Sequence, residues 1–331
     1  MTVETDGRDD DAGIWPSFSV IVPTYQRRDL VCDALRALAA IEYPGWHETI
    51  VVIDGSTDGT QEAIAALSLP VAPRVLRHDN IGLARTRNRG AQEARGDVLL
   101  FLDDDMIVQP DILVAHARAL AAGADAVMGD IPLDPQSPPG FLSAGVGVWA
   151  AERRDRLALG GPIDTGDLLG GHLSIRRAVF EAVGGFDARF TQDGSYGNED
   201  LDMGVRLLAR HVVRFCADAV AFQRYVVTPQ LNLRQYFQAG EADVLFAAKH
   251  PDRADDVFGA HQPGRARARL VLRPLARVPG LHRLLGAAAC ACADRLWGFS
   301  PVIDRFIERF FVQVREVVYW AGVTQAQRML H

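Results

Sequence analysis

Hydrophobic positions along the chain alternate between short continuous runs and longer stretches with helical spacing. The continuous runs predict strands at residues 18–22, 49–53, 71–76, 98–102 and 126–128. Between them, apolar residues recur at three- and four-residue intervals, which predicts helices at 30–41, 60–67, 83–94 and 111–122. Strands that alternate with helices are typical of βαβ units, in which helices cover both faces of a mostly parallel sheet. The pattern therefore predicts an α/β fold.

The second half of the chain has a different pattern. Residues 132–170 are rich in glycine and proline, and we expect a long loop there. A second α+β stretch follows at 171–225, and from residue 231 the pattern is mainly helical. We therefore expect a disordered tail at 1–15, one α/β domain at 16–225 and a mainly helical extension at 226–331.

Charge is unevenly distributed along the 331 residues. The whole chain has 35 basic and 42 acidic residues, but residues 263–331 hold 11 arginines against four acids. This basic segment carries +7, which leaves −14 for the rest of the chain. An acidic body argues against a nucleic-acid partner. The acidic start of the chain, the four scattered cysteines and the lack of a long apolar run predict a cytoplasmic protein without a transmembrane helix.

Polar clusters follow three of the predicted strands, at residues 23–27, 54–60 and 103–105. In an open α/β sheet, ligands bind beyond the carboxyl ends of the strands, so we expect these clusters to line one crevice. Asp103, Asp104 and Asp105 repel one another unless a cation neutralises them, and carboxylate oxygens suit Mg²⁺ or Mn²⁺. The alternative is that these side chains cap the following turn in water.

Other polar residues also allow two interpretations each. Asp54 suits either a turn or a hydrogen bond to a base or ribose. Arg77, like the arginines of the helix at 83–94, suits either phosphate binding or a solvated surface. Glu199 and Asp200 begin a helix, where the dipole favours acids, or they supply a general base. The sequence lacks the glycine-rich phosphate loop of ATPases and the glycine fingerprint of dinucleotide enzymes.

Seven segments in order resemble glycosyltransferase family 2, of the inverting GT-A type. They read SVIVPTY at 19–25, VVIDGSTDGT at 51–60, NIGLARTRNRG at 80–90, FLDDD at 101–105, SIRR at 174–177, GGFD at 184–187 and ED at 199–200. The resemblance covers about residues 17–225. It implies a GT-A catalytic domain, a Rossmann-like, mostly parallel sheet flanked by helices, followed by the helical extension.

The resemblance also implies a reaction. A hexosyl group would move from a nucleotide-sugar donor, most often UDP-linked, to a hydroxyl of a sugar, a lipid-linked sugar or a small natural product. Asp200 would be the catalytic base with Glu199 beside it, and Mn²⁺ or Mg²⁺ would bind Asp103 and Asp105. The donor-binding residues implied are Pro23, Tyr25, Asp54, Arg77, Asp103, Asp104 and His172, the last of which would contact the donor sugar or the acceptor.

The sequence departs from the family pattern at one position, and two alternative functions remain. Many relatives have a metal-binding histidine near the position of Gln223, so the third metal ligand is open. A non-catalytic nucleotide-sugar binding protein is the main alternative function. A nucleotidyltransferase is less consistent, because residues 23–28 contain no glycine. The basic segment, including the amphipathic stretch at 301–319, predicts either contact with an anionic membrane or acidic acceptor, or packing on the acidic core or in a homo-oligomer interface.

Overall fold

A computed structural model describes residues 15–192, 197–259, 261 and 271–329. The predicted tail at 1–15 lies, except for Trp15, outside the described residues. The chain divides into two compact units. The first contains residues 15–138, 146–188 and 199–225, and the second contains the described parts of 139–145, 189–198 and 226–331. The two units are described separately below.

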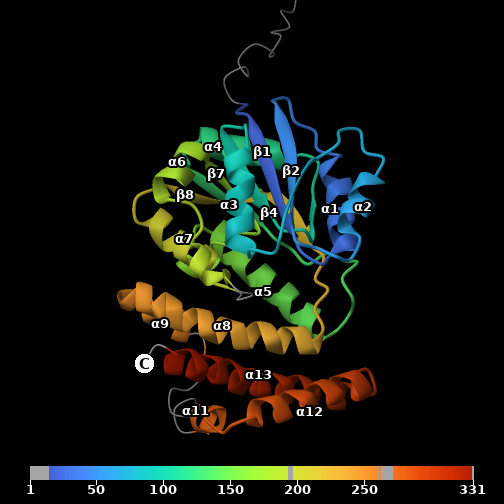
Figure 1. The fold of residues 1–331 in the computed structure, drawn as a ribbon, viewed down its shortest axis with the longest axis vertical. Coiled ribbons are helices and arrows are strands. Elements are labelled where there is room, and N and C mark those ends of the chain that lie inside the picture. The colour runs from blue at the N-terminus through green and yellow to red at the C-terminus, as the bar shows by residue number, and fades with distance from the viewer. Residues whose placement is uncertain (1–14, 193–196, 260, 262–270, 330–331) are drawn as a thin grey trace, which may run out of the picture. The chain divides into compact units, whose positions relative to one another are not determined.

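The first unit is built on a mixed sheet with strand order β3-β2-β1-β4-β7-β6-β8-β5 (Figure 1). Its strands are β1 (Phe18–Thr24), β2 (His47–Asp54), β3 (Arg74–His78), β4 (Val98–Leu102), β5 (Met106–Val108), β6 (Ala126–Asp130), β7 (His172–Arg176) and β8 (Val213–Gln223). Strands β1 to β4 are parallel, and so are β6 and β8. Strand β7 is antiparallel to β4 and β6, and β5 is antiparallel to β8. The predicted α/β class is confirmed, with these two antiparallel strands added.

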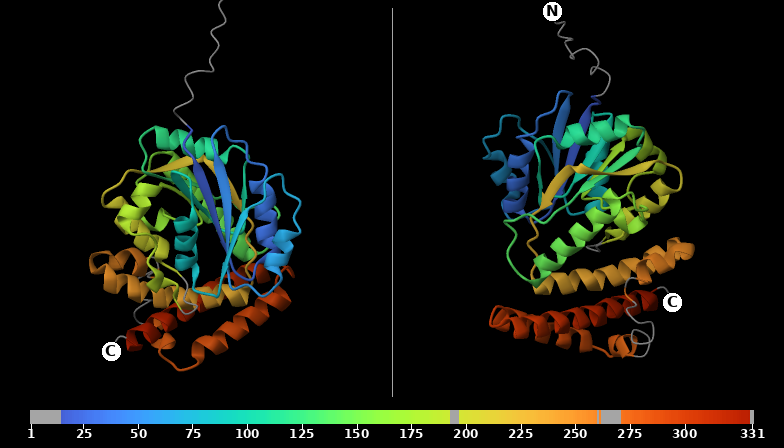
Figure 2. Two further views of the ribbon diagram at one scale, coloured as in Figure 1. Left: turned by 45° about the horizontal axis from the view of Figure 1, so that its top comes forward. Right: turned by 180° about the vertical axis from the view of Figure 1, so that it is seen from behind.

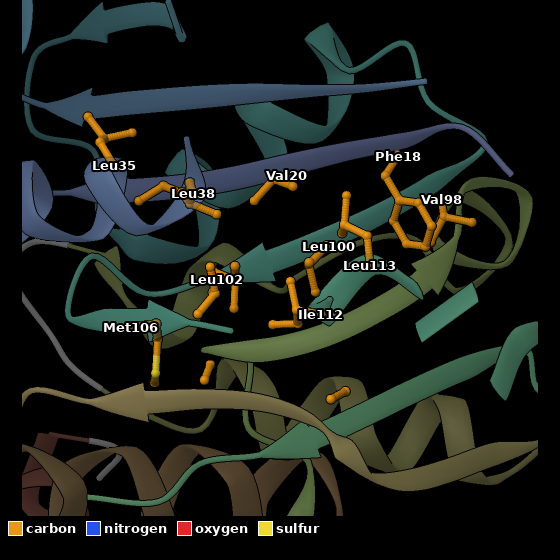
Figure 3. Close-up of a cluster of buried hydrophobic side chains, with 14 of the residues drawn as sticks. Phe18, Val20, Leu35, Leu38, Val98, Leu100, Leu102, Met106, Ile112 and Leu113 are labelled. Atoms are coloured by element: carbon orange, nitrogen blue, oxygen red, sulfur yellow. The ribbon is translucent and has the colours of Figure 1, made fainter. Parts of the chain in front are cut away.

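Helices cover both faces of this sheet. Side chains alternate along each strand, so Phe18, Val20 and Val22 face one layer while Ile21 faces the other. The first layer contains α1 (Arg28–Leu38), α2 (Thr60–Ala65) and α4 (Ile112–Ala121), and Figure 3 shows part of its apolar core. The second layer contains α3 (Leu83–Glu93), α6 (Arg177–Val183) and α7 (Glu199–Leu208). Because both faces of the sheet are buried at its centre, β4 is a continuous apolar run, whereas the edge strand β3 is only partly buried and contains arginines.

Two expectations about elements were wrong, and one strand was missed. The predicted loop at 132–170 contains α5 (Phe141–Ala158) and a short 3-10 helix, η1 (Thr165–Asp167). Its apolar first half contains glycines and its second half is charged, so no single apolar stripe runs along the helix. Strand β3 begins at residue 74 instead of 71, because Pro73 lacks the N–H that a strand ladder needs. The three-residue strand β5 was not predicted.

The second unit is helical, as expected. Its helices are α8 (Pro229–Lys249), α9 (Ala254–Phe258), α11 (Arg273–Ala276), α12 (Leu281–Leu296) and α13 (Pro301–Met329). Helices α8 and α13 lie side by side (Figures 1 and 2). A Cβ on Gly240 would lie 2.3 Å from the Tyr319 carbonyl oxygen, so only glycine allows this close approach of the two backbones. Within the described ranges, no helix is both long and apolar enough to cross a membrane.

Candidate active site

The loop after β1 and the acidic turn after β4 meet at the carboxyl ends of these neighbouring strands. The strand order reverses here, because β2 lies on one side of β1 and β4 on the other. Such a switch point is where ligands bind in open α/β sheets. Thr24 Oγ1 donates a hydrogen bond of 2.7 Å to Asp104 Oδ2, which joins the two loops directly. The predicted meeting of these two clusters is therefore confirmed.

Arg27 neutralises two of the three aspartates in this turn. Its Nη1 lies 2.7 Å from Asp104 Oδ1 and its Nη2 lies 2.9 Å from Asp105 Oδ2. Both carboxylates are buried, and burial raises the pKa of each, while the charge of Arg27 opposes that rise. Oδ1 of Asp105 is buried without a hydrogen bond of normal geometry, although the Gln223 amide lies close enough to lower the pKa of Asp105. Asp105 Oδ1 is therefore the carboxylate oxygen of this turn that Arg27 leaves unpaired.

Arg87 connects the acidic turn to the start of α7. It is buried on the inner face of α3, and its Nη2 donates to Asp103 Oδ1 at 2.7 Å. Its Nη1 donates to Glu199 Oε1 at 2.8 Å, and its guanidinium lies 5.3 Å from the Phe186 ring centroid. Burial raises the pKa of Glu199, the neighbouring Asp200 raises it further, and Arg87 opposes both effects. One buried cation therefore fixes two predicted site residues that are 96 positions apart in the sequence.

Asp200, the predicted general base, follows Glu199 at the start of α7. It is half-buried in the first turn of α7, where its Oδ1 accepts a 2.8 Å hydrogen bond from the Leu201 N–H. Its Oδ2 lies 3.5 Å from the Gly170 N–H, a long contact. Burial raises the pKa of Asp200, and Arg87 limits the rise. A carboxylate whose pKa is raised towards neutrality is a better general base than a fully solvated one.

The expected donor-binding residues are spread along the same edge of the sheet. Pro23 is buried within β1, and Tyr25 directly after it is exposed. Asp54 ends β2, and its carboxylate accepts hydrogen bonds from the backbone N–H groups of residues 81 and 82 at 2.7 and 3.1 Å. Arg77 lies on the outer strand β3, exposed, and donates to Gln61 Oε1 at 2.8 Å. Asp54 thus orders the loop before α3, and the structure does not bring Arg77 into the acidic cluster.

His172 lies in the core of the first unit, and its expected contact with the donor or acceptor stays a prediction. Its ring is 1% exposed and packs against Gly129, where a Cβ would lie 1.9 Å from His172 Cε1. His172 Nδ1 must donate to the Asp130 carbonyl at 3.2 Å, so its Nε2 accepts from His116 Nε2 at 3.0 Å. His116 Nδ1 then accepts from the Ser174 hydroxyl. Burial lowers the pKa of His172 to about 3, so this pair is neutral.

Sequence reasoning missed the roles of the two arginines. Arg27 belonged to a recognised polar cluster but had no assigned partner, and Arg87 was assigned to phosphate or solvent. The helical spacing does contain a signal, because Arg87 lies on the stripe formed by Ala84 and Ala91, which are both buried. A cation on the apolar stripe of a helix predicts a buried carboxylate partner.

The described residues contain no group of three or more His, Cys, Asp or Glu side chains arranged to hold a metal ion. The acidic turn still has the oxygen donors that Mg²⁺ and Mn²⁺ prefer, including the unpartnered Asp105 Oδ1. A cavity of about 690 Å³ lies elsewhere, in the second unit, and is lined mainly by α8 and α12. None of the predicted site residues lines that cavity. A large cavity volume therefore does not identify the active site in this chain.

Comparisons with known proteins agree with this geometry. A family model described as Glycosyl transferase family 2 matches residues 19–184, half of the chain, and one described as N-terminal domain of galactosyltransferase matches 158–229. Validoxylamine A glucosyltransferase of Streptomyces hygroscopicus subsp. limoneus is 30% identical over 227 residues, or 60% of this chain and 49% of that protein. The O-antigen biosynthesis protein RfbC of Myxococcus xanthus is 32% identical over 222 residues, or 61% of this chain and 16% of that protein.

Solved structures share the fold. A mannosyltransferase from Pyrobaculum calidifontis in complex with GDP-Man and Mn²⁺ has a TM-score of 0.56 at 18% identity, covering 91% of this chain and 86% of that one. S. aureus TarS 1-349 in complex with UDP has a TM-score of 0.56 at 16% identity, covering 95% and 92%. These likenesses support the GT-A fold. The chain spans about half the length of the validoxylamine A glucosyltransferases that it matches. Because the family model covers the strand-end clusters that form the site, the chain belongs to glycosyl transferase family 2.

Proposed function

We propose that this glycosyltransferase moves a hexosyl group from a UDP-linked sugar donor to an acceptor hydroxyl. The reaction inverts the configuration at the anomeric carbon. The observation that carries the proposal is the network in which Arg87 joins Asp103 of the acidic turn to Glu199, the neighbour of Asp200. The start of α7, which this network holds, also carries Asp200, whose pKa burial raises, and this supports the proposed base role. The acceptor class, a sugar, a lipid-linked sugar or a small natural product, follows from the family and is part of the proposal.

The reaction is a single displacement. The acceptor hydroxyl gives its proton to an Asp200 carboxylate oxygen as its own oxygen bonds to the anomeric carbon. The bond from that carbon to the nucleoside diphosphate breaks on the opposite face, and the leaving group takes the bonding electrons. Arg87 holds Glu199 and Asp103 in place, so the chain of contacts fixes where the base stands relative to the acidic turn. Positioning of this kind supplies a large part of the rate acceleration in transfer reactions.

Asp103 and Asp105 are the residues that would hold a divalent ion. Each carboxylate is already paired with one arginine, and Asp105 keeps a free oxygen. When bound, Mn²⁺ or Mg²⁺ supplies positive charge that stabilises the departing diphosphate. Gln223 lies beside Asp105, near the position where the family predicts a metal-binding histidine, and its amide lowers the pKa of Asp105.

Replacement of the base tests the assignment of Asp200. Asp200→Asn should lower kcat by on the order of 10²–10⁴, because proton transfer by a positioned group contributes about that much. UDP binding measured by calorimetry should be unchanged. Asp111→Asn is the matched control, since Asp111 also stands at a helix N-terminus, is exposed and makes no side-chain capping bond. Full activity of the Asp200→Asn enzyme would remove this residue from the base role.

Replacement of the metal ligand tests the second assignment. Asp105→Ala should abolish the difference between UDP affinities measured with Mn²⁺ and with EDTA, because it removes the free carboxylate oxygen. The arginine pair of Asp104 remains, so the turn stays neutralised. An unchanged Mn²⁺ effect on UDP affinity would contradict the assignment.

The alternative is a protein that binds nucleotide sugars without transfer, and Gln223 in place of a histidine is the observation that favours it. Turnover with a panel of donors and acceptors decides between the two. Binding of a donor with no transfer to any acceptor class would support the alternative.

A further inference from the structure

Arg27 pairs with two neighbouring carboxylates of the acidic turn at once. Its Nη1 lies 2.7 Å from Asp104 Oδ1 and its Nη2 lies 2.9 Å from Asp105 Oδ2. The same guanidinium thus supplies the positive charge that these two buried carboxylates need. Asp105 is also a proposed ligand of Mn²⁺ or Mg²⁺. The protein's own cation and the divalent ion therefore share a carboxylate.

The backbone beside Arg27 is held in place by the loop after β2. Gln26 has a φ of 53°, in the left-handed region that residues other than glycine adopt infrequently. Its backbone N–H donates to Ser56 Oγ at 3.0 Å, and its side chain exchanges two hydrogen bonds with Thr57. Arg27 comes next and directly precedes α1. Because its backbone is held on both sides, the guanidinium leaves Asp105 only by a change of side-chain rotamer.

Arg27 and Arg87 differ in how tightly the protein encloses them. The Arg87 side chain is 3% exposed and pairs with Asp103 and Glu199. The Arg27 side chain is 33% exposed, although the two carboxylates that it pairs with are buried. Water or a bound anion can reach a guanidinium that is one-third exposed, and the enclosed Arg87 lacks this access. Of the two arginines of the acidic turn, Arg27 is therefore the one that can change partners.

The ion pairs of Arg27 also occupy most of the oxygens that a metal ion would use. Thr24 Oγ1 and Arg27 Nη1 contact the two oxygens of Asp104, and Arg27 Nη2 contacts Oδ2 of Asp105. Asp105 Oδ1 is buried without a hydrogen bond of normal geometry. A divalent ion and a guanidinium on the same carboxylate repel each other. Each of these cations therefore weakens the binding of the other to Asp105.

We propose that Arg27 competes with the divalent ion for Asp105 and so makes ion binding depend on the nucleotide. The inference rests on the proposed function, which supplies the ion and the nucleotide. In the metal-free enzyme Arg27 holds Asp105, and when the ion binds the guanidinium gives up this carboxylate. It then needs another anion, and its planar fork of donors fits phosphate oxygens as well as a carboxylate. The nucleotide brings such an anion, so the ion binds weakly without the nucleotide and more tightly with it.

Binding of Mn²⁺ in the absence of turnover tests the competition. Electron paramagnetic resonance measures the free ion, with and without UDP, for the full-length wild type and for Arg27→Gln. Arg27→Gln should bind Mn²⁺ alone on the order of tenfold more tightly, because the competing charge is gone. UDP should then tighten Mn²⁺ binding less than in the wild type, and Mn²⁺ should tighten UDP binding less by the same factor. Arg28→Gln is the matched control, because the exposed Arg28 pairs with Asp29 at 2.9 Å and not with the acidic turn.

Two further variants separate competition from damage to the fold. Arg27→Ala leaves space beside the carboxylates, so guanidinium chloride at millimolar concentration should weaken Mn²⁺ binding to this variant, and sodium chloride at the same concentration should not. A turn that had merely lost its shape would respond to both salts alike. Arg27→Lys keeps the charge on a compact ammonium that does not bridge two carboxylates, so its Mn²⁺ affinity should lie between those of the wild type and Arg27→Gln. Arg27→Lys decides the question if the neutral variants do not fold.

Two results would overturn the role of Arg27 alone. The first is the same Mn²⁺ affinity, without UDP, in the wild type and in the Arg27 variants. The second is an effect of UDP on Mn²⁺ affinity that is equally large in all of them. A failure of the proposed function has a different outcome, because the wild type with UDP would then bind no Mn²⁺, or Asp105→Ala would keep the effect of Mn²⁺ on UDP affinity. In that case the metal assignment is wrong, and the inference about Arg27 falls with it.

Discussion

Replacement of His172 by glutamine distinguishes a structural histidine from a ligand-binding one. His172 is fully buried, and both of its ring nitrogens have protein partners. Glutamine keeps one donor and one acceptor for Asp130 and His116 but has no charged form between acid and neutral pH. His172→Gln should therefore change the acid sensitivity of the fold and leave donor affinity near pH 8 unchanged.

The size of the effect follows from the pKa of His172. In the folded chain this pKa is about 3, against an ordinary value of 6.5. Between these two values the unfolded chain binds the proton more readily, so stability is complete above about pH 6.5 and falls as the pH falls. At about pH 5 the loss attributable to His172 is roughly 2 kcal/mol, from about 1.4 kcal/mol per pH unit over some 1.5 units.

Urea unfolding near pH 5 and near pH 8 measures this loss. The wild-type protein should lose about 2 kcal/mol more than His172→Gln over that interval. His47→Gln is the control, because the His47 ring is only half-buried at the start of β2. The His47→Gln protein should therefore retain most of the acid sensitivity of the wild type. Nitrogen-15 NMR gives a second readout, in which His172 should carry its proton on Nδ1 and His116 on Nε2.

Two results would refute the reasoning. One is the same pH dependence in His172→Gln as in the wild type. The other is a donor KM raised several-fold near pH 8 with unchanged acid stability, which would return His172 to the binding site.

Two further substitutions test the geometry of the site. Gly171→Ala should lower kcat/KM by on the order of 10²-fold with little change in melting temperature. The reason is that the alanine Cβ would lie 2.4 Å from Asp103 Oδ2 and displace this carboxylate from Arg87. Unaltered kinetics would show that the position of this carboxylate does not matter. Asp54→Ala should lower the free energy of unfolding by about 2–4 kcal/mol, because the N–H groups of residues 81 and 82 lose their acceptor. Asp54→Asn should lower it less, because the amide keeps one acceptor oxygen. A loss well below that range for Asp54→Ala would contradict the role of Asp54 in ordering the loop.

The elements that the sequence predicted well are those whose burial is visible in local pattern. Strands β1 and β4 are buried on both faces, so β4 is an unbroken apolar run and only Ser19 interrupts the apolar part of β1, which indicates a buried strand in both cases. Helix α5 has no such pattern, because glycines interrupt its apolar half. Strand β5 has only three residues and depends on β8, more than 100 positions later, for its partner. Local pattern carries no information about that pairing.

The same distinction applies to the site. The acidic turn and Asp200 lie where the motifs indicated, since strand ends and helix starts are local features. The arginine partners are not local, because Arg27 pairs with an aspartate 77 positions away and Arg87 with a glutamate 112 positions away. The chain has 34 arginines, so a single sequence does not say which of them faces which acid.

The short strand β5 has a consequence for how the protein is made. The acidic turn is held on one side by the bond from the Asp103 N–H to the Gly171 carbonyl. On the other side, the Arg224 N–H donates to the Asp105 carbonyl, and β5 pairs with β8. A nascent chain that has just emerged as far as β4 and β5 lacks both of these anchors. The ribosome must deliver residue 224 before the turn can take its final shape, so the acidic cluster is completed late in the folding of the first unit, and fragments that end before β8 should lack it.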